Sequence, residues 1–312
     1  MPGRSTPSRS GLIYGVLAYL CWGFFPLYWP LLEPATPWEV LAHRIVWSLV
    51  FCVVLLTVTR TWRAYAAIFT RPRQLGLLAA ASVVITVNWG GFIWGVTHGH
   101  VVETSLGYFI NPLVTVLLGV VVLGERLRRW QWTAVALGAF AVVVLSVDNG
   151  GPPWIALLLA FSFATYGFIK KRVNLGTIET LSVETTILTP FAVGYLVLLQ
   201  LTGQLVFGHA GLANTLLLMG TGVVTAIPLL LFGAAATRLP LSTIGVLQYL
   251  VPILQFALGL TVFGEQMGAA RWAGFALVWL ALAIFTADAL RHQRRVAVER
   301  RVAEAGAITP VS

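Results

Sequence analysis

Ten apolar runs divide this chain, and they constrain its fold more than any other feature. A helix needs about 20 apolar residues to cross a hydrocarbon core of roughly 30 Å, which is close to the length of each run. With 58% hydrophobic and 10% charged residues, the chain has more apolar surface than one compact core could bury. We therefore predict an all-α integral membrane protein with ten transmembrane helices. The runs lie near residues 11–32, 38–59, 74–97, 101–123, 130–147, 152–171, 178–201, 213–236, 241–263 and 270–290.

The basic residues between the runs, with one exception, fall on one side of the membrane if ten helices cross it. The loops on the other side contain only Arg271. Lys and Arg concentrate in cytoplasmic loops, so this distribution predicts that both termini are cytoplasmic. It also explains the net charge of +9 without a nucleic-acid partner, because the charges do not gather on one surface with aromatic residues. The residues are Arg4, Arg9, Arg60, Arg63, Arg71, Arg73, Arg126, Arg128, Arg129, Lys170, Lys171, Arg172, Arg238, Arg291, Arg294, Arg295, Arg300 and Arg301.

Two stretches repeat at an offset of 140 residues. SLGYFINPLVTVLLGVVVLGERLRRWQW aligns with STIGVLQYLVPILQFALGLTVFGEQMGAARW, and in this alignment a proline, a Gly-Glu pair and a tryptophan coincide. Each repeat holds five spans, and because five is odd, the second repeat enters from the opposite side. Inverted repeats are typical of secondary transporters, which bind substrate near the midplane between the halves. The coincident positions are Pro112 and Pro252, Gly124-Glu125 and Gly264-Glu265, and Trp132 and Trp272.

The repeat gives a division of the chain into four segments. We predict a cytoplasmic N-terminal segment at 1–10, a first repeat at 11–147, a second repeat at 148–290 and a basic cytoplasmic tail at 291–312. The tail either lies along the anionic inner leaflet or is simply solvated. The first run is too long for the apolar region of a signal peptide, so we expect it to remain as a span.

Motifs of the common enzyme classes are missing from the sequence. It has no Gly-rich phosphate loop, no HExxH zinc motif and no GxSxG elbow, and the cysteines Cys21 and Cys52 lack metal-ligand spacing. We expect no enzyme activity, no cofactor and no metal. Any transport would have to be driven by a gradient.

The stretch EVLAHRIVWS places an arginine inside the second run. Arg44 lies about six residues from the predicted outer end of that run, roughly 9 Å deep at 1.5 Å per residue. A charged side chain costs roughly 2.5–3.5 kcal/mol at the bilayer centre, so it indicates either a functional site or an anchor that extends to the headgroups. Glu39 and His43 would crowd the same interface without benefit, which favours function.

The same offset of 140 places Arg44 opposite Glu184 in the alignment of the halves. Inversion separates the two residues across the membrane, so we predict a local partner for each. Glu103 is within reach of Arg44, and Arg238 lies on the side of Glu184. Two such pairs could close the outer and inner gates in turn.

Other polar residues also lie within the runs. Asn88 and Gln255 are expected to join helices, whereas Tyr108 and Asn111 precede Pro112, and Gln248 and Tyr249 precede Pro252. Proline frees a backbone carbonyl one turn earlier, and irregular backbone in a membrane is tolerated where it lines a cavity. These two stretches are the best candidates for a substrate site. Trp29 is interpreted as an interfacial anchor.

Several short motifs together resemble a known family. YLCWGFFPLYW, EVLAHRIVWS, NWGGFIWGV, SLGYFINPL, LGERLRRWQW, TAIPLLLFGAA and GVLQYLVP are similar to the RarD-type permeases, a branch of the EamA family in the drug/metabolite transporter superfamily. The resemblance runs from about residue 11 to 290 and implies ten spans in two inverted EamA repeats. It also implies a secondary permease, often linked to chloramphenicol sensitivity. Glu103 matches the family pattern VNxGxVxExSLGYF, whereas His98 departs from it.

Together these features predict a gradient-driven permease, more an exporter than an importer, for a small organic solute in the inner (cytoplasmic) membrane. The expected partners are this solute and membrane lipid, and the oligomeric state is undetermined. Proton coupling is left open, with Glu39, His43, Glu103, Glu184 and Asp288 as the titratable candidates. The alternative is a non-transporting membrane sensor or partner-binding protein, which the short cytoplasmic loops disfavour.

Overall fold

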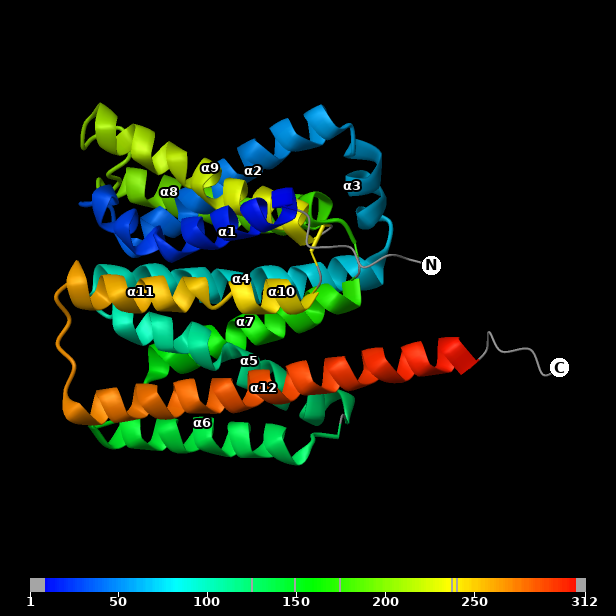
Figure 1. Cartoon of the computed structure of the whole chain (residues 1–312). Helices are drawn as coiled ribbons and strands as arrows, with labels where there is room; N and C mark the ends of the chain where they lie inside the picture. Colours follow the sequence, from blue (N-terminus) through cyan, green and yellow to red (C-terminus); the bar gives the residue numbers. More distant parts are fainter. Residues whose placement is uncertain are drawn as a thin grey trace. The chain divides into compact units, whose positions relative to one another are not determined.

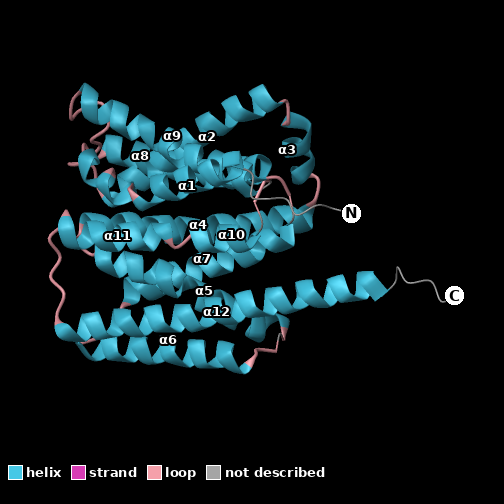
Figure 2. Ribbon diagram, viewed as in Figure 1, coloured by secondary structure: helices cyan, strands magenta, loops and turns pink. Residues whose placement is uncertain are grey.

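Helices make up all the regular secondary structure that the computed structural model describes (Figure 2). The structure describes residues 9–124, 126–148, 150–173, 175–236, 238–239 and 241–306. Most of the predicted N-terminal segment 1–10, Glu125 of the repeat, and the end of the predicted tail lie outside these residues. Within them, the all-α prediction is confirmed.

The helices follow one another with short connections (Figure 1). Pro37 begins the second long helix, and Thr36 caps it by accepting a hydrogen bond from the backbone N–H of Glu39 at 3.3 Å. Arg60 ends the same helix in the left-handed conformation, with a φ of 56°. The elements are α1 (Arg9–Gly23), η1 (Phe25–Leu27), η2 (Trp29–Leu32), α2 (Pro37–Thr59), α3 (Trp62–Phe69), α4 (Pro72–Thr97), α5 (Val101–Leu123), α6 (Arg129–Asp148), α7 (Trp154–Val173), α8 (Thr177–Leu201), α9 (Leu212–Ala236), α10 (Leu241–Leu247), α11 (Leu250–Thr261) and α12 (Ala269–Gly306).

The predicted spans correspond to these helices. In the described part of the chain, nine helical segments are long and apolar enough to cross a membrane. The count becomes ten if α1 and the η1–η2 turns, which bend by 41° at Gly23–Phe25, form one span. The predicted run 241–263 is divided into α10 and α11 by a turn at Gln248–Tyr249. The multi-pass membrane character is therefore confirmed, while the orientation of the termini and the inverted repeat stay predictions.

Two elements differ from the prediction. The gap between the second and third runs contains the short helix α3, which buries Ile68 and places Tyr65 against Thr186 of α8, with 3.0 Å between their hydroxyl oxygens. The last candidate span, Ala269–His292, ends close to the predicted residue 290, but its helix α12 does not end there and continues to Gly306. The chemistry of helix propensity explains this: the sequence after 290 is rich in Arg, Ala, Val and Glu and contains no Gly or Pro before Gly306.

The chain forms two compact units. The first comprises residues 1–111 and 154–266, and the second comprises 112–153 and 267–312. The division falls between Asn111 and Pro112 inside α5 and does not follow the predicted repeats, since each unit takes helices from both halves. The second unit is built on antiparallel packing of α6 and α12, which lie side by side in Figure 1.

The first unit has α2 and α4 at its centre. Helix α2 packs against α8, α9 and α4, while α4 also packs against α7. Its largest hydrophobic cluster includes Phe25, Trp29, Ile45 and Phe92, so it joins the η1–η2 turns to α2 and α4. The buried polar side chains discussed below lie in this unit.

Candidate functional site

Arg44 is almost fully enclosed within the first unit, with 4% of its surface exposed. Its Nε donates a hydrogen bond to the hydroxyl of Thr225 on α9 at 3.0 Å. The guanidinium carbon lies 4.1 Å from the ring centre of Trp89 on α4, 5.3 Å from Trp29 and 5.8 Å from Phe25. Aromatic faces at these distances attract a cation. Four elements therefore supply an aromatic and polar surround for one charge.

The hydroxyl of Thr225 is oriented by its own helix. Thr225 donates to the carbonyl of Thr221 at 2.8 Å, which leaves its oxygen lone pairs to accept from Arg44. One turn earlier on α9, a Cβ at Gly222 would clash with the carbonyl oxygen of Trp47 on α2. Only glycine permits this approach, and it brings Thr225 to Arg44.

The η1–η2 turns are tied to α9 as well. The hydroxyl of Tyr28 donates to the carbonyl of Leu217, and the side-chain amide of Asn214 donates to the carbonyls of Leu32 and Glu33 at 2.9 and 3.0 Å. These bonds hold Trp29, which is 1% exposed, beside Arg44. Trp29 is therefore not the interfacial anchor that its position near a span end predicted: it is a wall of the arginine site.

Arg44 has no carboxylate within 4 Å among the residues that the structure describes. Breaking a buried ion pair by removing one partner typically costs about 3–5 kcal/mol, because a buried charge is left uncompensated. Here the cation is balanced only by a hydroxyl and by aromatic faces. Such a residue inside a membrane indicates function by default.

Glu39 lies one turn before His43 on α2, and its carboxylate binds the loop between α8 and α9. Its Oε1 accepts hydrogen bonds from the backbone N–H groups of Val206 at 2.9 Å and Phe207 at 3.0 Å. The ring of Phe207 lies over that of His43, with 4.6 Å between centres, and His43 Nε2 is 3.8 Å from Glu39 Oε1. Both side chains are buried, and Glu39 Oε2 and both ring nitrogens of His43 lack a hydrogen-bond partner within the described residues. Glu39 thus fastens this loop to α2.

Glu103 and Glu184 each have a local partner. Glu103 accepts from the backbone N–H of Ile155 at 3.0 Å, in the first turn of α7, where the helix dipole favours an anion. Glu184 accepts from Lys170 Nζ at 2.9 Å and from the hydroxyl of Tyr166 at 3.0 Å. Lys170 also donates to Thr180.

The gate pairs predicted from the sequence are therefore not those of the structure. Glu184 pairs with Lys170 of α7, whereas Arg238 donates to the carbonyl of Ala234 at 2.7 Å and lies over Tyr14 at 5.6 Å. Arg44 is bound by Thr225 and the aromatic rings. The reason is packing: the helices that face Arg44 carry hydroxyl and aromatic groups at its level.

The amides in the spans join neighbouring helices. Asn88 of α4 donates to the carbonyl of Leu159 at 3.1 Å and to the hydroxyl of Ser162 at 2.9 Å, both on α7. Asn111 of α5 donates to the carbonyl of Ala160 on α7 at 3.1 Å. These contacts join α4 and α5 to α7, and the role of Asn111 as a site residue stays a prediction.

The two proline stretches differ in the structure. Helix α5 continues through Pro112, and Tyr108 packs between Phe92 and Phe163, at 5.8 and 6.0 Å between ring centres. Tyr108 also packs against the hydrophobic cluster of Phe25 and Trp29, as Trp89 does. The chain before Pro252 instead leaves the helix at Gln248 and Tyr249, and the side chain of Gln248 is exposed. Tyr108 thus belongs with the arginine site.

Thr225 and Lys170 were not predicted as site residues from the sequence. Thr225 lies in an apolar run with ordinary helical spacing, and Lys170 reads as part of the basic cluster at the end of α7. Nothing in their own neighbourhoods distinguishes them. Across the described part of the chain, no three His, Cys, Asp or Glu side chains group as a metal site.

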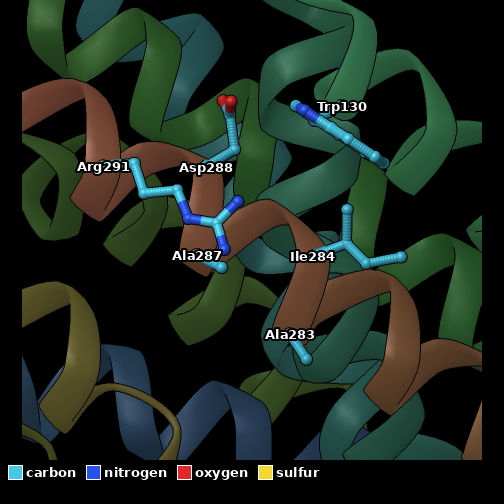
Figure 3. A pocket seen from close by; sticks show the side chains of 6 residues that line it. All are labelled: Trp130, Ala283, Ile284, Ala287, Asp288 and Arg291. Atoms are coloured by element: carbon cyan, nitrogen blue, oxygen red, sulfur yellow. The ribbon is translucent and has the colours of Figure 1, made fainter.

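A pocket of about 300 Å³ lies in the second unit, and Figure 3 shows the side chains around it. Arg128 binds the carboxylate of Asp288 beside this pocket, through Nε at 2.7 Å and Nη2 at 2.6 Å. This ion pair joins the connection before α6 to α12 and gives Asp288 a structural partner. The pocket is lined by Trp130, Ala283, Ile284, Ala287, Asp288 and Arg291.

The fold is that of a multi-pass helical membrane protein, and comparison with known proteins defines its family. The model of the EamA-like transporter family matches residues 9–147. The protein RarD of Streptomyces exfoliatus is 56% identical over 92% of this chain and 91% of its own. The protein RarD of Escherichia coli K12 is 43% identical over 92% and 97%. The chain belongs to the RarD-type permeases of the EamA family.

More distant matches agree. A Pseudomonas aeruginosa protein named chloramphenicol-sensitive protein RarD is 30% identical over 93% of this chain and 98% of its own. A solved crystal structure with 18% identity superposes with a TM-score of 0.55, covering 90% of this chain and 98% of the other. At this identity the structural match shows the fold alone.

Proposed function

We propose that this membrane transporter is a gradient-driven secondary permease that exports a small organic solute across the inner membrane by alternating access. The observation that carries the proposal is the buried guanidinium of Arg44, which has Thr225 and aromatic rings around it and, among the described residues, no carboxylate within 4 Å. An uncompensated cation inside apolar helices is costly, and a polar ligand that enters the site would offset that cost. Binding energy of this kind can differ between outward-open and inward-open states.

Two breaks in the membrane-spanning helices support a mechanism that involves a conformational change. The η1–η2 turns interrupt the end of the first span, and the Gln248–Tyr249 turn interrupts the span formed by α10 and α11. Interrupted helices at membrane depth are typical of secondary transporters, where they surround the substrate. In the proposed cycle, the two predicted inverted repeats open to the two sides in turn.

Counterflow in proteoliposomes tests the proposal. A thermal-stability screen of the purified protein against metabolites and antibiotics, including chloramphenicol because of the name of the Pseudomonas relative, first identifies a compound that binds the folded state. Vesicles are then loaded with the unlabelled compound and diluted into a trace of the labelled one. A carrier accumulates label transiently inside the vesicles.

The sensor alternative predicts a different result. A sensor binds the compound and raises the melting temperature, but label inside the vesicles never exceeds that in protein-free vesicles. Repeating the assay with an imposed proton gradient decides proton coupling, because flux that ignores the gradient excludes it.

A further inference from the structure

We infer that Arg44 and the aromatic side chains around it bind the carboxylate of a small organic anion, so that the transported solute is an organic acid with an apolar or aromatic body. This inference rests on the proposed function and names its substrate class. It starts from the donors of Arg44. Only Nε makes a hydrogen bond within the described residues, to Thr225, so the terminal nitrogens Nη1 and Nη2 keep their donors for another acceptor.

A second donor in the same cluster lacks an acceptor. The indole Nε1–H of Trp29 is buried and has no hydrogen-bond partner among the described residues. Buried tryptophan N–H groups usually find one. The Trp29 ring is 5.3 Å from the guanidinium carbon, so this buried indole N–H is a neighbour of the terminal nitrogens of Arg44, for which the described residues provide no hydrogen-bond acceptor. Both would be satisfied by a ligand rich in acceptors.

Three acidic side chains of this unit, Glu39, Glu103 and Glu184, are engaged with other partners. Glu39 accepts from the backbone of Val206 and Phe207, Glu103 from that of Ile155, and Glu184 from Lys170 and Tyr166. None of them is within 4 Å of Arg44. The charge that would balance Arg44 is therefore absent from the described protein and would come from the ligand.

The geometry selects a carboxylate with an apolar body. Guanidinium presents a planar fork that matches a carboxylate with two parallel hydrogen bonds, and Thr225 holds the fork from the Nε side. Trp89, Phe25 and Tyr108 surround it with apolar surface. An organic cation would be repelled at the same position. Because Arg44 is 4% exposed, the ligand can enter only when these walls move, as they do in an alternating-access cycle.

Matched pairs of acids and amides test the inference. Melting temperature is measured by intrinsic tryptophan fluorescence against increasing concentrations of phenylacetate and phenylacetamide, and of indole-3-acetate and indole-3-acetamide. Sodium chloride, sodium sulfate and phenethylamine hydrochloride serve as the inorganic-anion and cation probes. We expect the acids to bind about tenfold or more tightly than their amides, since a charge-assisted bidentate contact replaces a neutral one. The cation should not bind.

Substitutions show which side chain causes the preference for acids over amides. Arg44→Gln should weaken the acids about tenfold or more and remove the preference over amides, while Arg44→Lys should lie between, because lysine keeps the charge but not the fork. Arg63→Gln on the exposed surface of α3 is the matched control and should bind like the wild type. If Arg44→Gln fails to fold, Thr225→Val and the acid-to-amide comparison on the wild type still decide. Thr225→Val should reduce the preference for acids over amides several-fold.

Four outcomes would overturn the inference: acids and amides bind equally, Arg44→Gln keeps the preference, sulfate or chloride stabilises as much as the organic acids, or no acid binds. Its failure can be told from that of the proposed function. A neutral solute that shows counterflow while every acid fails removes the organic acid and leaves the permease. Acids that bind through Arg44 but never show counterflow leave the site and remove transport.

Discussion

Two buried charges of the first unit have opposite surroundings. Glu184 is 2% exposed and is neutralised by Lys170 and hydrogen-bonded by Tyr166, all on the adjacent helices α7 and α8. Arg44 is about equally buried but is met by a hydroxyl and by aromatic faces. A compensated charge contributes to helix packing, whereas an uncompensated one is available to a ligand. The partners of a buried charged side chain thus indicate whether it stabilises helix packing or is available to a ligand.

We predict strong coupling between Lys170 and Glu184. Lys170→Met leaves a buried carboxylate without its cation and should reduce the free energy of unfolding by about 3 kcal/mol, the lower end of the range because Lys170 is 22% exposed. Lys170→Met combined with Glu184→Gln should recover most of this loss. The coupling is obtained from the free energies of unfolding of the wild type, the two single variants and the double variant, measured by reversible unfolding in mixed micelles.

A second double-mutant cycle, between Arg44 and Glu103, is the control for the cycle between Lys170 and Glu184. Arg44→Gln and Glu103→Gln should be additive within about 0.5 kcal/mol, because the two side chains have separate partners. Coupling of 1 kcal/mol or more in this cycle, or additivity in the first, would contradict the assignment of partners.

At the scale of elements, α2 and α9 approach closely at one glycine. The Cβ of an alanine at Gly222 would meet the backbone carbonyl of Trp47, which cannot move aside as a side chain could. We predict that Gly222→Ala destabilises the protein by about 1–3 kcal/mol through overpacking and weakens any ligand that binds through Arg44. Unfolding and ligand titration measure the two effects.

Gly233 on the same helix is the matched control, because a Cβ there meets no atom within 4 Å. Gly233→Ala should leave stability unchanged or raise it by up to about 1 kcal/mol, the difference in helix propensity. Equal effects of the two substitutions would show that the close approach at Gly222 does not matter.

The loop between α8 and α9 depends on Glu39. We predict that Glu39→Ala increases hydrogen exchange at the amides of Val206 and Phe207, which lose their acceptor. Glu39→Gln keeps one acceptor oxygen and should have a smaller effect. The amide of Gly208 bonds to Thr215 instead and serves as the internal reference. Equal acceleration at Gly208 would mean that the whole loop loosens without a specific role of Glu39.

At the scale of the whole molecule, the basic loops predict how the chain lies in the membrane. In a variant without Cys21 and Cys52, a cysteine at His98 should react with a membrane-impermeant maleimide in intact cells, because the predicted topology places His98 outside. A cysteine at Arg63 should react only after the membrane is permeabilised. The reverse pattern would invert the predicted topology.

The sequence predicted the framework well because hydrophobic length and basic loops are properties of the chain itself. The spans, the membrane class and the family follow from them, and EVLAHRIVWS already showed that an ion lies within a span. It predicted the break before Pro252 but not that α5 continues through Pro112. It missed α3 because a short amphipathic helix between basic residues reads as a loop.

Partner choice was decided only by the tertiary structure. Arg44 and Thr225 are 181 residues apart, and from the sequence we predicted Glu103 as the partner of Arg44 instead. Which helices become neighbours, and at what height, depends on close contacts such as Gly222 against Trp47. Hydrophobic periodicity states that a helix crosses the membrane but not which helix it touches. The sequence by itself therefore determined a membrane transporter of the EamA family, with ten apolar runs and a cation inside one of them. Packing alone determined that no carboxylate of the described residues lies within 4 Å of this cation.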